Sequence, residues 1–215
     1  PFRARKEKKR RTSFTMYGAL YRAAAHNFDI GSIIDVGASN GSWSMLANRL
    51  FPDRPVLAFE PLSEQREVLE RLKQNHPWFD YVQAVAGEEE GEVPFFVSDD
   101  LDGSGVSENG ERVVPMVTID LEVKRRRLNP PHMLKLDTHG FELPILKGAE
   151  VTLEDCEVVI IEVYNFQLTD IALRFHEMCA FMEARGFRCF DLADPMLRAR
   201  DAALWQMDLF FARHD

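Results

Sequence analysis

The feature that most constrains the fold is a strand-like run that leads directly into a glycine-containing turn, Ile33-Ile34-Asp35-Val36-Gly37-Ala38-Ser39-Asn40-Gly41-Ser42. The residues that follow, up to about 50, are amphipathic and predict a helix. Strand–turn–helix units of this kind build open α/β sheets, which bind ligands outside the carboxyl ends of their strands. Gly37 and Gly41 permit close backbone approach, and the helix N-terminus offers free N–H groups. The segment therefore predicts a ligand site at this turn.

The acid two residues before the first glycine indicates which ligand the turn favours. The glycine spacing departs from the G-x-G-x-x-G pattern of dinucleotide-binding turns, which weakens a dinucleotide interpretation. Asp35 instead favours a ligand with a cationic amine, such as the methionine end of S-adenosylmethionine, over a pyrophosphate. The competing interpretation is that the glycines only form a tight turn, which Asp35 caps.

Beyond this segment, short apolar runs alternate with amphipathic stretches. Helices are expected over residues 15–26, 42–50, 63–75, 142–148 and 169–185, and Ser63 is the expected N-cap of the third. Strands are expected over residues 32–36, 55–59, 81–86, 92–97, 113–117, 133–136, 158–163, 187–192 and 204–212. This alternation implies a parallel sheet with helices on both faces. The loop between the last two strands is too short for a helical crossover, so they are expected to pair antiparallel.

We therefore expect an α/β, Rossmann-like fold whose mostly parallel, seven-stranded sheet contains one antiparallel strand. No internal repeat or domain boundary is apparent, so residues 15–215 are expected to form a single domain preceded by a basic arm over residues 1–14. At 215 residues the chain is long enough to bury a sizeable core. The three cysteines lack disulfide or zinc spacing, and no apolar run resembles a membrane span or a secretory signal. These features favour a cytoplasmic protein.

Charge is distributed unevenly along the chain. Residues 1–11 contain seven Lys or Arg and one Glu, which leaves 19 basic and 34 acidic side chains in the other 204 residues, a net charge of −15. A body this acidic repels a phosphate backbone, so nucleic acid is not expected as the main substrate. The basic segment at residues 1–11 is suited to weak contact with an anionic membrane or RNA, although such runs are more often solvated chain ends.

A second acid follows the next expected strand. Glu60 lies 25 residues after Asp35, the distance at which Rossmann-like folds place an acid that holds ribose hydroxyls. Pro61 follows it and helps to end the strand sharply. An acid at a strand end is ordinary by itself, but together with the Asp-Gly turn it indicates a nucleoside-containing ligand.

A third group of polar residues lies in Met133-Leu134-Lys135-Leu136-Asp137-Thr138-His139-Gly140-Phe141-Glu142. The strand is expected to deliver Asp137, His139 and Glu142 to the same sheet edge as Asp35 and Glu60. If the ligand is a methyl donor and the acceptor a hydroxyl, a base assists the transfer, and His139 has a suitable intrinsic pKa. The alternative is a histidine that only packs in a turn.

A fourth group lies in Val158-Val159-Ile160-Ile161-Glu162-Val163-Tyr164-Asn165. A carboxylate within an apolar strand is costly unless it is paired. Glu162 therefore either holds the acceptor or satisfies a structural partner such as Lys135. Asp137, His139 and Glu162 are residue types that bind metals, but their spacing matches no familiar metal motif, so no metal is expected.

Together these segments resemble the FkbM family of methyltransferases. The resemblance covers about residues 28–165 and also includes Thr118-Ile119-Asp120 and Leu146-Lys147-Gly148-Ala149. It implies a class I fold that uses S-adenosylmethionine, releases S-adenosylhomocysteine, and usually O-methylates a hydroxyl of a sugar, glycan or natural product. Where the family commonly has Asn this chain has Ser39, and where it commonly has an acid this chain has His139.

Site assignments follow from the motifs and the resemblance together. The expected cofactor contacts are Asp35, Gly37, Ala38, Ser39, Gly41, Glu60, Pro61, Gln83, Ala84 and Asp137, with Gln83 and Ala84 near the adenine by position alone. The expected catalytic residues are His139 and Asp137, and the expected acceptor contacts are Glu142, Glu162 and Tyr164. The partner is expected to be a small-molecule or glycan acceptor, and the oligomeric state stays open.

Three other functions remain as alternatives, one of them an adaptor that contacts a membrane or RNA through the basic segment at residues 1–11. A nicotinamide-dependent oxidoreductase shares the strand–turn–helix unit and the ribose acid, but lacks the G-x-G-x-x-G turn and the antiparallel ending. Another alternative is a methyltransferase-like domain that has no catalytic activity and serves for binding or as a scaffold. The presence of Asp35, Gly37 and Glu60 argues against a loss of cofactor binding, although not against a loss of catalysis.

Overall fold

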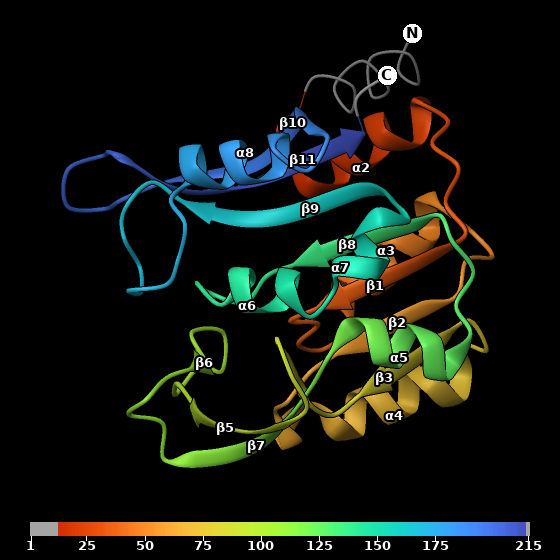
Figure 1. The fold of residues 1–215 in the computed structure, drawn as a ribbon, viewed down its shortest axis with the longest axis horizontal. Helices are drawn as coiled ribbons and strands as arrows, with labels where there is room; N and C mark the ends of the chain where they lie inside the picture. The colour runs from red at the N-terminus through yellow and green to blue at the C-terminus, as the bar shows by residue number, and fades with distance from the viewer. Residues whose placement is uncertain (1–12, 214–215) are drawn as a thin grey trace, which may run out of the picture.

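The computed structural model describes residues 13–213 (Figure 1). Most of the expected basic arm, and with it the suggested contact of residues 1–11 with an anionic surface, lies outside the described residues. The first described residues contact the C-terminal part of the chain and the first helix. The Asp194 N–H donates to the Phe14 carbonyl (2.6 Å), and Arg22 Nη1 donates to the Ser13 carbonyl (2.7 Å).

A seven-stranded sheet forms the centre of the described chain, in the order β10-β11-β9-β8-β1-β2-β3 (Figure 1). Its strands are β1 (Ser32–Val36), β2 (Val56–Phe59), β3 (Phe79–Val82), β8 (His132–Leu136), β9 (Cys156–Tyr164), β10 (Phe187–Leu197) and β11 (Leu204–Arg213). Strand β11 is antiparallel to both of its neighbours, and the other pairings are parallel. The expected sheet, with its single antiparallel strand, is confirmed.

Helices cover both faces of this sheet because successive strand residues point to opposite faces. Ile33 packs in the core beneath α2 (Met16–Ala25), α3 (Ser42–Leu50) and α4 (Arg66–Asn75). Its neighbour Ile34 packs in the opposite core, beneath α5 (Ile119–Arg126), α6 (Glu142–Lys147), α7 (Glu150–Glu154) and α8 (Phe175–Glu183). The central strands are therefore apolar on both sides, which explains their continuous apolar sequence.

A second, four-stranded sheet, which the sequence did not indicate as a separate unit, lies beside the carboxyl ends of the central strands (Figure 1). It consists of β4 (Val85–Ala86), β5 (Gly91–Phe96), β6 (Gly105–Val106) and β7 (Arg112–Val117), in the order β4-β7-β5-β6. The strand expected over residues 81–86 is interrupted at Gln83 and Ala84, so that β3 stays in the large sheet and β4 joins the small one.

Several helix predictions were wrong in their limits. The helix expected over residues 63–75 begins as a 3-10 turn, η1 (Ser63–Gln65), and the Ser63 hydroxyl bonds Glu64 instead of capping the helix. The helix expected over residues 169–185 starts only at Phe175, because Gln167 and Thr169 form a hydrogen-bonded loop before it. Helix α5 was not expected, although its cap was visible in the sequence: Thr118 Oγ1 accepts a hydrogen bond from the Leu121 N–H.

The strand order places a crevice next to β1. The chain runs outward from β1 through β2 to β3 and then returns to β8 on the other side of β1, so the order reverses between β1 and β8. Open α/β sheets bind ligands at such a switch point. Among the described residues, no helix is long and apolar enough to cross a membrane.

Candidate active site

A cavity of about 280 Å³ opens at this switch point. Its floor comes from the ends of β1, β2, β8 and β9, and its opposite wall comes from the small sheet and the loop that contains β6. The lining residues are Val36, Gly37, Ser39, Phe59, Glu60, Pro61, Leu62, Ala84, Val85, Ala86, Phe95, Leu101, Asp102, Ser104, Gly105, Val106, Asp137, Thr138, His139, Phe141 and Glu162. One continuous cavity thus joins the glycine turn to the Asp-Thr-His segment.

The turn after β1 is held close to the end of β8. Gly37 has φ +78°, and a Cβ there would lie 1.9 Å from the Asp137 carbonyl oxygen, so only glycine fits. Gly41 has the same φ, but a Cβ on it would meet Leu72 of α4, and Gly41 does not line the cavity. Ala38 is buried between these glycines and does not line the cavity either. Gly37 and Ser39 are therefore the residues of the turn that line the cavity.

Glu60 is fixed by backbone groups on both of its carboxylate oxygens. The Ser39 N–H donates to Oε2 (2.7 Å) and the Leu62 N–H donates to Oε1 (2.8 Å). Burial raises the pKa of Glu60 and outweighs these two hydrogen bonds, which lower it. Because each carboxylate oxygen can accept two hydrogen bonds, Glu60 keeps acceptor capacity toward the cavity that it lines.

The other expected cofactor contacts differ in position. Pro61 and Ala84 line the cavity. Gln83 does not, and its side chain accepts a hydrogen bond from Arg66 Nε (2.6 Å). Of the two residues expected near the adenine, Ala84 therefore lines the cavity and Gln83 does not.

Asp35 lies behind the cavity and is not among the residues that line it. Its side chain is fully buried, accepts a hydrogen bond from Ser44 Oγ (2.6 Å), and has Oδ1 3.4 Å from Lys135 Nζ. Asp35 and Lys135 are directly paired in the parallel register of β1 and β8, which brings the two charges together. The Asp35 carboxylate thus has a hydrogen-bond partner in Ser44 and an ion-pair partner in Lys135 within the protein.

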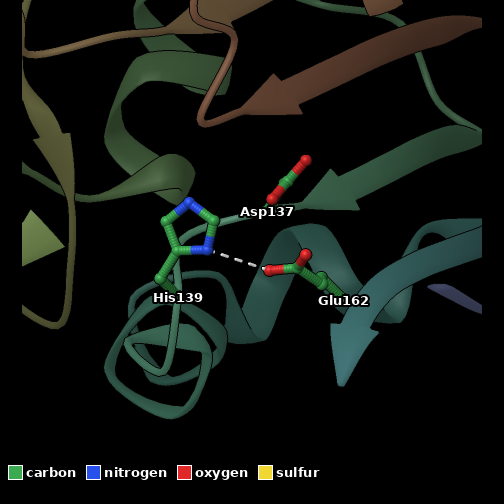
Figure 2. Close-up of side chains that lie close together, drawn as sticks. All are labelled: Asp137, His139 and Glu162. Atoms are coloured by element: carbon green, nitrogen blue, oxygen red, sulfur yellow. Dashed lines mark hydrogen bonds and ion pairs between the residues drawn. The ribbon is translucent and has the colours of Figure 1, made fainter. Parts of the chain in front are cut away.

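Asp137, His139 and Glu162 come together at the other end of the cavity (Figure 2). His139 Nδ1 lies 3.1 Å from Glu162 Oε2 and 2.9 Å from the Tyr164 hydroxyl. Tyr164 donates to Glu162 Oε2 (2.6 Å), and Gln206 Nε2 donates to Glu162 Oε1 (2.7 Å). Lys135, which the sequence suggested as a partner for Glu162, instead bonds Asp137 Oδ2 (3.0 Å).

The charges of this cluster shift the pKa values of its members. The hydrogen bond to Glu162 raises the pKa of His139 to about 9, with further contributions from the Glu162 and Asp137 charges. Burial, followed by the charges of Asp137 and Glu162, raises the pKa of Asp208 to about 8. Burial would lower the pKa of Lys135, but Asp137 and Asp35 raise it above its usual value. His139 is therefore an imidazolium at neutral pH. The intrinsic pKa of histidine, on which the sequence-based role as a base depended, does not apply at this position.

Glu142 and Tyr164, two of the expected acceptor contacts, do not line the cavity. Glu142 is buried, and its Oε1 accepts hydrogen bonds from the Gly140 N–H (3.0 Å) and Thr138 Oγ1 (3.1 Å). It thus holds the turn that carries His139 at a positive φ of +55°. Tyr164 supports Glu162 from behind, so Glu162 is the member of this set that reaches the cavity.

Sequence reasoning missed two polar residues on β11, and it did not identify which residues of the 98–110 loop line the cavity. Gln206 bonds Glu162, and Asp208 lies opposite Glu162 in the antiparallel register. Both are polar residues within the apolar run Leu204-Trp205-Gln206-Met207-Asp208-Leu209, the same signal that singled out Glu162. Leu101, Asp102 and Val106 have no comparable signal, because a loop sequence does not tell where the loop folds back.

Solved structures of low sequence identity share this fold. Methyltransferase FkbM from Methylobacillus flagellatus matches 84% of this chain with a TM-score of 0.54 and 17% identity. The O-methyltransferase TomG from Streptomyces achromogenes, involved in tomaymycin synthesis and solved with SAM, matches 91% with a TM-score of 0.52 and 14% identity. TrmK from M. capricolum, solved with S-adenosyl-homocysteine, matches 92% with a TM-score of 0.52 and 7% identity.

The family follows from the sequence match. The sequence model of the methyltransferase FkbM domain family matches residues 35–189 of this chain. The chain therefore belongs to this family. The resemblance drawn from the motifs is confirmed, as is the class of fold. The matches cover 43% of the Methylobacillus flagellatus chain, 78% of TomG and 68% of TrmK, so this chain spans less than half of the first of these. No curated protein is recognisably similar to it in sequence.

Proposed function

We propose that this chain is an S-adenosylmethionine-dependent methyltransferase that holds its cofactor between the β1 turn and Glu60. The observation that carries the proposal is the fixed carboxylate of Glu60, which lines the cavity next to Gly37 at the point where the strand order reverses. Membership of a methyltransferase family supports it, and so do the solved complexes of TomG with SAM and of TrmK with S-adenosyl-homocysteine.

Each residue at this end of the cavity has a role in the proposal. Glu60 accepts hydrogen bonds from the ribose hydroxyls, which matches its free acceptor capacity. Gly37 and Ser39 contact the methionine part, and Ala84 and Pro61 contact the adenine. Residues 15–215 act as one domain.

The proposed acceptor is a hydroxyl of a sugar, a glycan or a natural product, bound at the end that contains Asp137, His139 and Glu162. Methyl transfer from a sulfonium needs chiefly an acceptor aligned with the methyl group, so positioning accounts for much of the rate. With a pKa of about 9, His139 acts as a base only after losing its own proton, so at neutral pH it contributes chiefly by holding Glu162 in place beside the acceptor. A small molecule fits this acidic chain better than a nucleic acid does.

Calorimetric titration of S-adenosylmethionine and S-adenosylhomocysteine tests the cofactor. We expect both to bind the wild-type protein and Glu60→Ala to abolish binding. Glu67→Ala is the matched control, because Glu67 is an exposed acid on α4. Failure of both compounds to bind well-folded wild-type protein would refute the proposal and favour a domain with a binding or scaffold role.

Formation of S-adenosylhomocysteine with a panel of sugars and other hydroxyl compounds tests the acceptor. Once an acceptor is found, His139→Ala should lower turnover by about 10²–10⁴-fold and leave cofactor affinity nearly unchanged. Lost cofactor affinity with unchanged turnover would contradict the role given to His139.

A cytoplasmic location is part of the proposal, since Cys156, Cys179 and Cys189 are all free thiols.

A further inference from the structure

We propose that Asp137, His139 and Glu162 bind a divalent transition-metal cation in the wall of the cavity. One ligand atom from each of the three lies within 4.8 Å of the others, and all three residues line the cavity (Figure 2). The site would leave the remaining coordination positions open toward the cavity, where a bound molecule supplies them. The proposed metal site depends only on these three residues. That the molecule bound next to the metal is the methyl acceptor rests on the proposed function.

The spacing of the ligand atoms suits coordination of one ion. Two ligand atoms bonded to the same ion at about 2.1 Å lie about 3.0 Å apart when adjacent and about 4.2 Å apart when opposite. His139 Nδ1 and Glu162 Oε2 are 3.1 Å apart, so this pair already has the adjacent spacing. The side chain of Asp137 is one-third exposed and has room to complete the set by a small inward movement.

Contacts behind the three residues resemble the outer contacts that orient metal ligands. Both oxygens of Glu162 are held, Oε1 by Gln206 and Oε2 by Tyr164. Lys135 holds Asp137 through Oδ2, which leaves Oδ1 outside this ion pair. The backbone of Asp102 is hydrogen-bonded to the His139 ring. Metal-binding histidines commonly donate their second N–H to a backbone carbonyl in this way.

The carboxylates of the site lie close to further acids. Asp208 is directly opposite Glu162 in the β9–β11 register, and Lys135 pairs with Asp35 as well as with Asp137. Carboxylates this close repel one another unless a proton or a cation lies between them. In the metal-free protein the imidazolium of His139 supplies positive charge here, and a divalent cation bound to Nδ1 would replace its proton.

The ligand types indicate which cations fit. Two carboxylates and one imidazole suit Mn²⁺, Fe²⁺ or Zn²⁺ better than Mg²⁺ or Ca²⁺, which prefer oxygen ligands throughout. Spacing along the sequence alone led to the expectation of no metal, because residues 137, 139 and 162 match no local motif. The three ligands meet only because β8 and β9 are neighbours in the sheet.

Pulsed electron paramagnetic resonance with Mn²⁺ as the probe tests the site in tag-free wild-type protein stripped with a chelator. We expect one bound Mn²⁺ per chain and a modulation from a coordinated ¹⁴N of His139. Absence of bound Mn²⁺, or bound Mn²⁺ without nitrogen coupling, would overturn the proposal. This measurement uses neither cofactor nor acceptor.

Variants identify the ligands. His139→Ala and Glu162→Gln should each weaken Mn²⁺ binding by at least about 100-fold, and Tyr164→Phe, which removes an outer contact, by about tenfold. Glu67→Gln is the control, an equal charge change at an exposed site that should leave Mn²⁺ binding unchanged. Equal losses in all four variants, or no loss in the first two while circular dichroism shows native folding, would refute the assignment.

The two proposals fail separately. If the protein binds S-adenosylmethionine but does not bind Mn²⁺, the metal site is refuted and the methyltransferase function stands. If it binds Mn²⁺ with nitrogen coupling but does not bind the cofactor, the metal site stands and the methyltransferase function is refuted. Addition of Mg²⁺ in excess should displace little Mn²⁺, because Mg²⁺ has low preference for imidazole. Ready displacement by Mg²⁺ would overturn the assignment of His139 as a ligand.

Discussion

The two ends of the cavity are built in different ways. At the end next to β1 and β2, the charged side chain that lines the wall is Glu60, and backbone N–H groups fix both of its oxygens. At the other end, Asp137, His139 and Glu162 are held chiefly by other side chains, several of which carry charge. The first end is thus determined by backbone geometry and the second by a balance of charges.

This difference predicts different responses to mutation and pH. A site whose shape is set by the backbone should lose ligand affinity when a larger residue keeps two backbone segments apart. Its affinity should change little with pH. A site built from charged side chains should tolerate small changes in shape, but should respond to protonation and to cations. The following predictions test this contrast, beginning with the largest expected effect.

Gly37→Ala should damage the β1 end most severely. A Cβ at this position would lie 1.9 Å from the Asp137 carbonyl oxygen, and the residue has φ +78°. Left-handed backbone costs about 1–2 kcal/mol for a non-glycine residue and overpacking about 1–3 kcal/mol, so we expect a loss of about 3 kcal/mol in unfolding free energy. Urea unfolding and cofactor calorimetry measure the two consequences.

Gly91→Ala is the matched control for this variant. A Cβ at Gly91 would meet nothing within 4 Å, so its effect should stay within about 0.5 kcal/mol. If Gly37→Ala were as mild as Gly91→Ala, the close approach of the β1 turn to β8 would not be what builds this end.

Glu60→Gln and Glu162→Gln make the same chemical change at the two ends. The amide in Glu60→Gln places an N–H₂ group against one of two backbone N–H groups, which should cost about 1–3 kcal/mol of stability and most of the cofactor affinity. Glu162→Gln relieves repulsion from Asp208 but weakens the hydrogen bond that stabilises the His139 imidazolium, so it should cost stability and leave cofactor affinity nearly unchanged. Equal losses of cofactor affinity in both variants would erase the distinction between the ends.

The same contrast explains how far the sequence could predict the site. The β1 turn and Glu60 were identified because each follows directly from a local pattern: a strand that ends in an Asp-Gly turn, and an acid at the end of the next strand. The parallel sheet and its antiparallel ending were predicted for the same reason, since loop lengths and alternation are local properties.

The other end could be predicted only in part, because its contacts join residues far apart in the chain. Glu162 was recognised as a polar residue in an apolar strand, but its partners Gln206 and Tyr164 depend on the register of β9 with β11. The position of Asp35 behind the cavity likewise follows from its register with Lys135, which the sequence of either strand alone does not contain.

The charge-built end should make stability depend on pH. The pKa of His139 is raised to about 9 and that of Asp208 to about 8, so both groups bind protons more tightly in the folded chain. Stability from His139 is fully present below its unfolded pKa of about 6.5 and is lost as the pH rises through 9; Asp208 acts in the same direction up to about pH 8. We expect metal-free protein to lose stability steadily between pH 6.5 and 9.

Urea unfolding in chelator at several pH values measures this slope, and NMR titration of the imidazole measures the pKa of His139 directly. His139→Asn should make the slope shallower, because it removes one of the two groups. A His139 pKa near 6.5, or an unchanged slope in the variant, would show that Glu162 does not stabilise the imidazolium.

Tyr164→Phe should give the smallest effect and separates the two ends most cleanly. Tyr164 donates to Glu162 and contacts His139 but does not line the cavity, so we expect a loss of about 1 kcal/mol with unchanged cofactor affinity. Tyr81→Phe is the control: its hydroxyl donates to Glu70, an exposed acid that water can solvate, so its loss should be smaller. If the two variants were equally stable, the buried hydrogen bonds of Glu162 would contribute no more than a surface contact, and the charge cluster would not be what organises this end of the cavity.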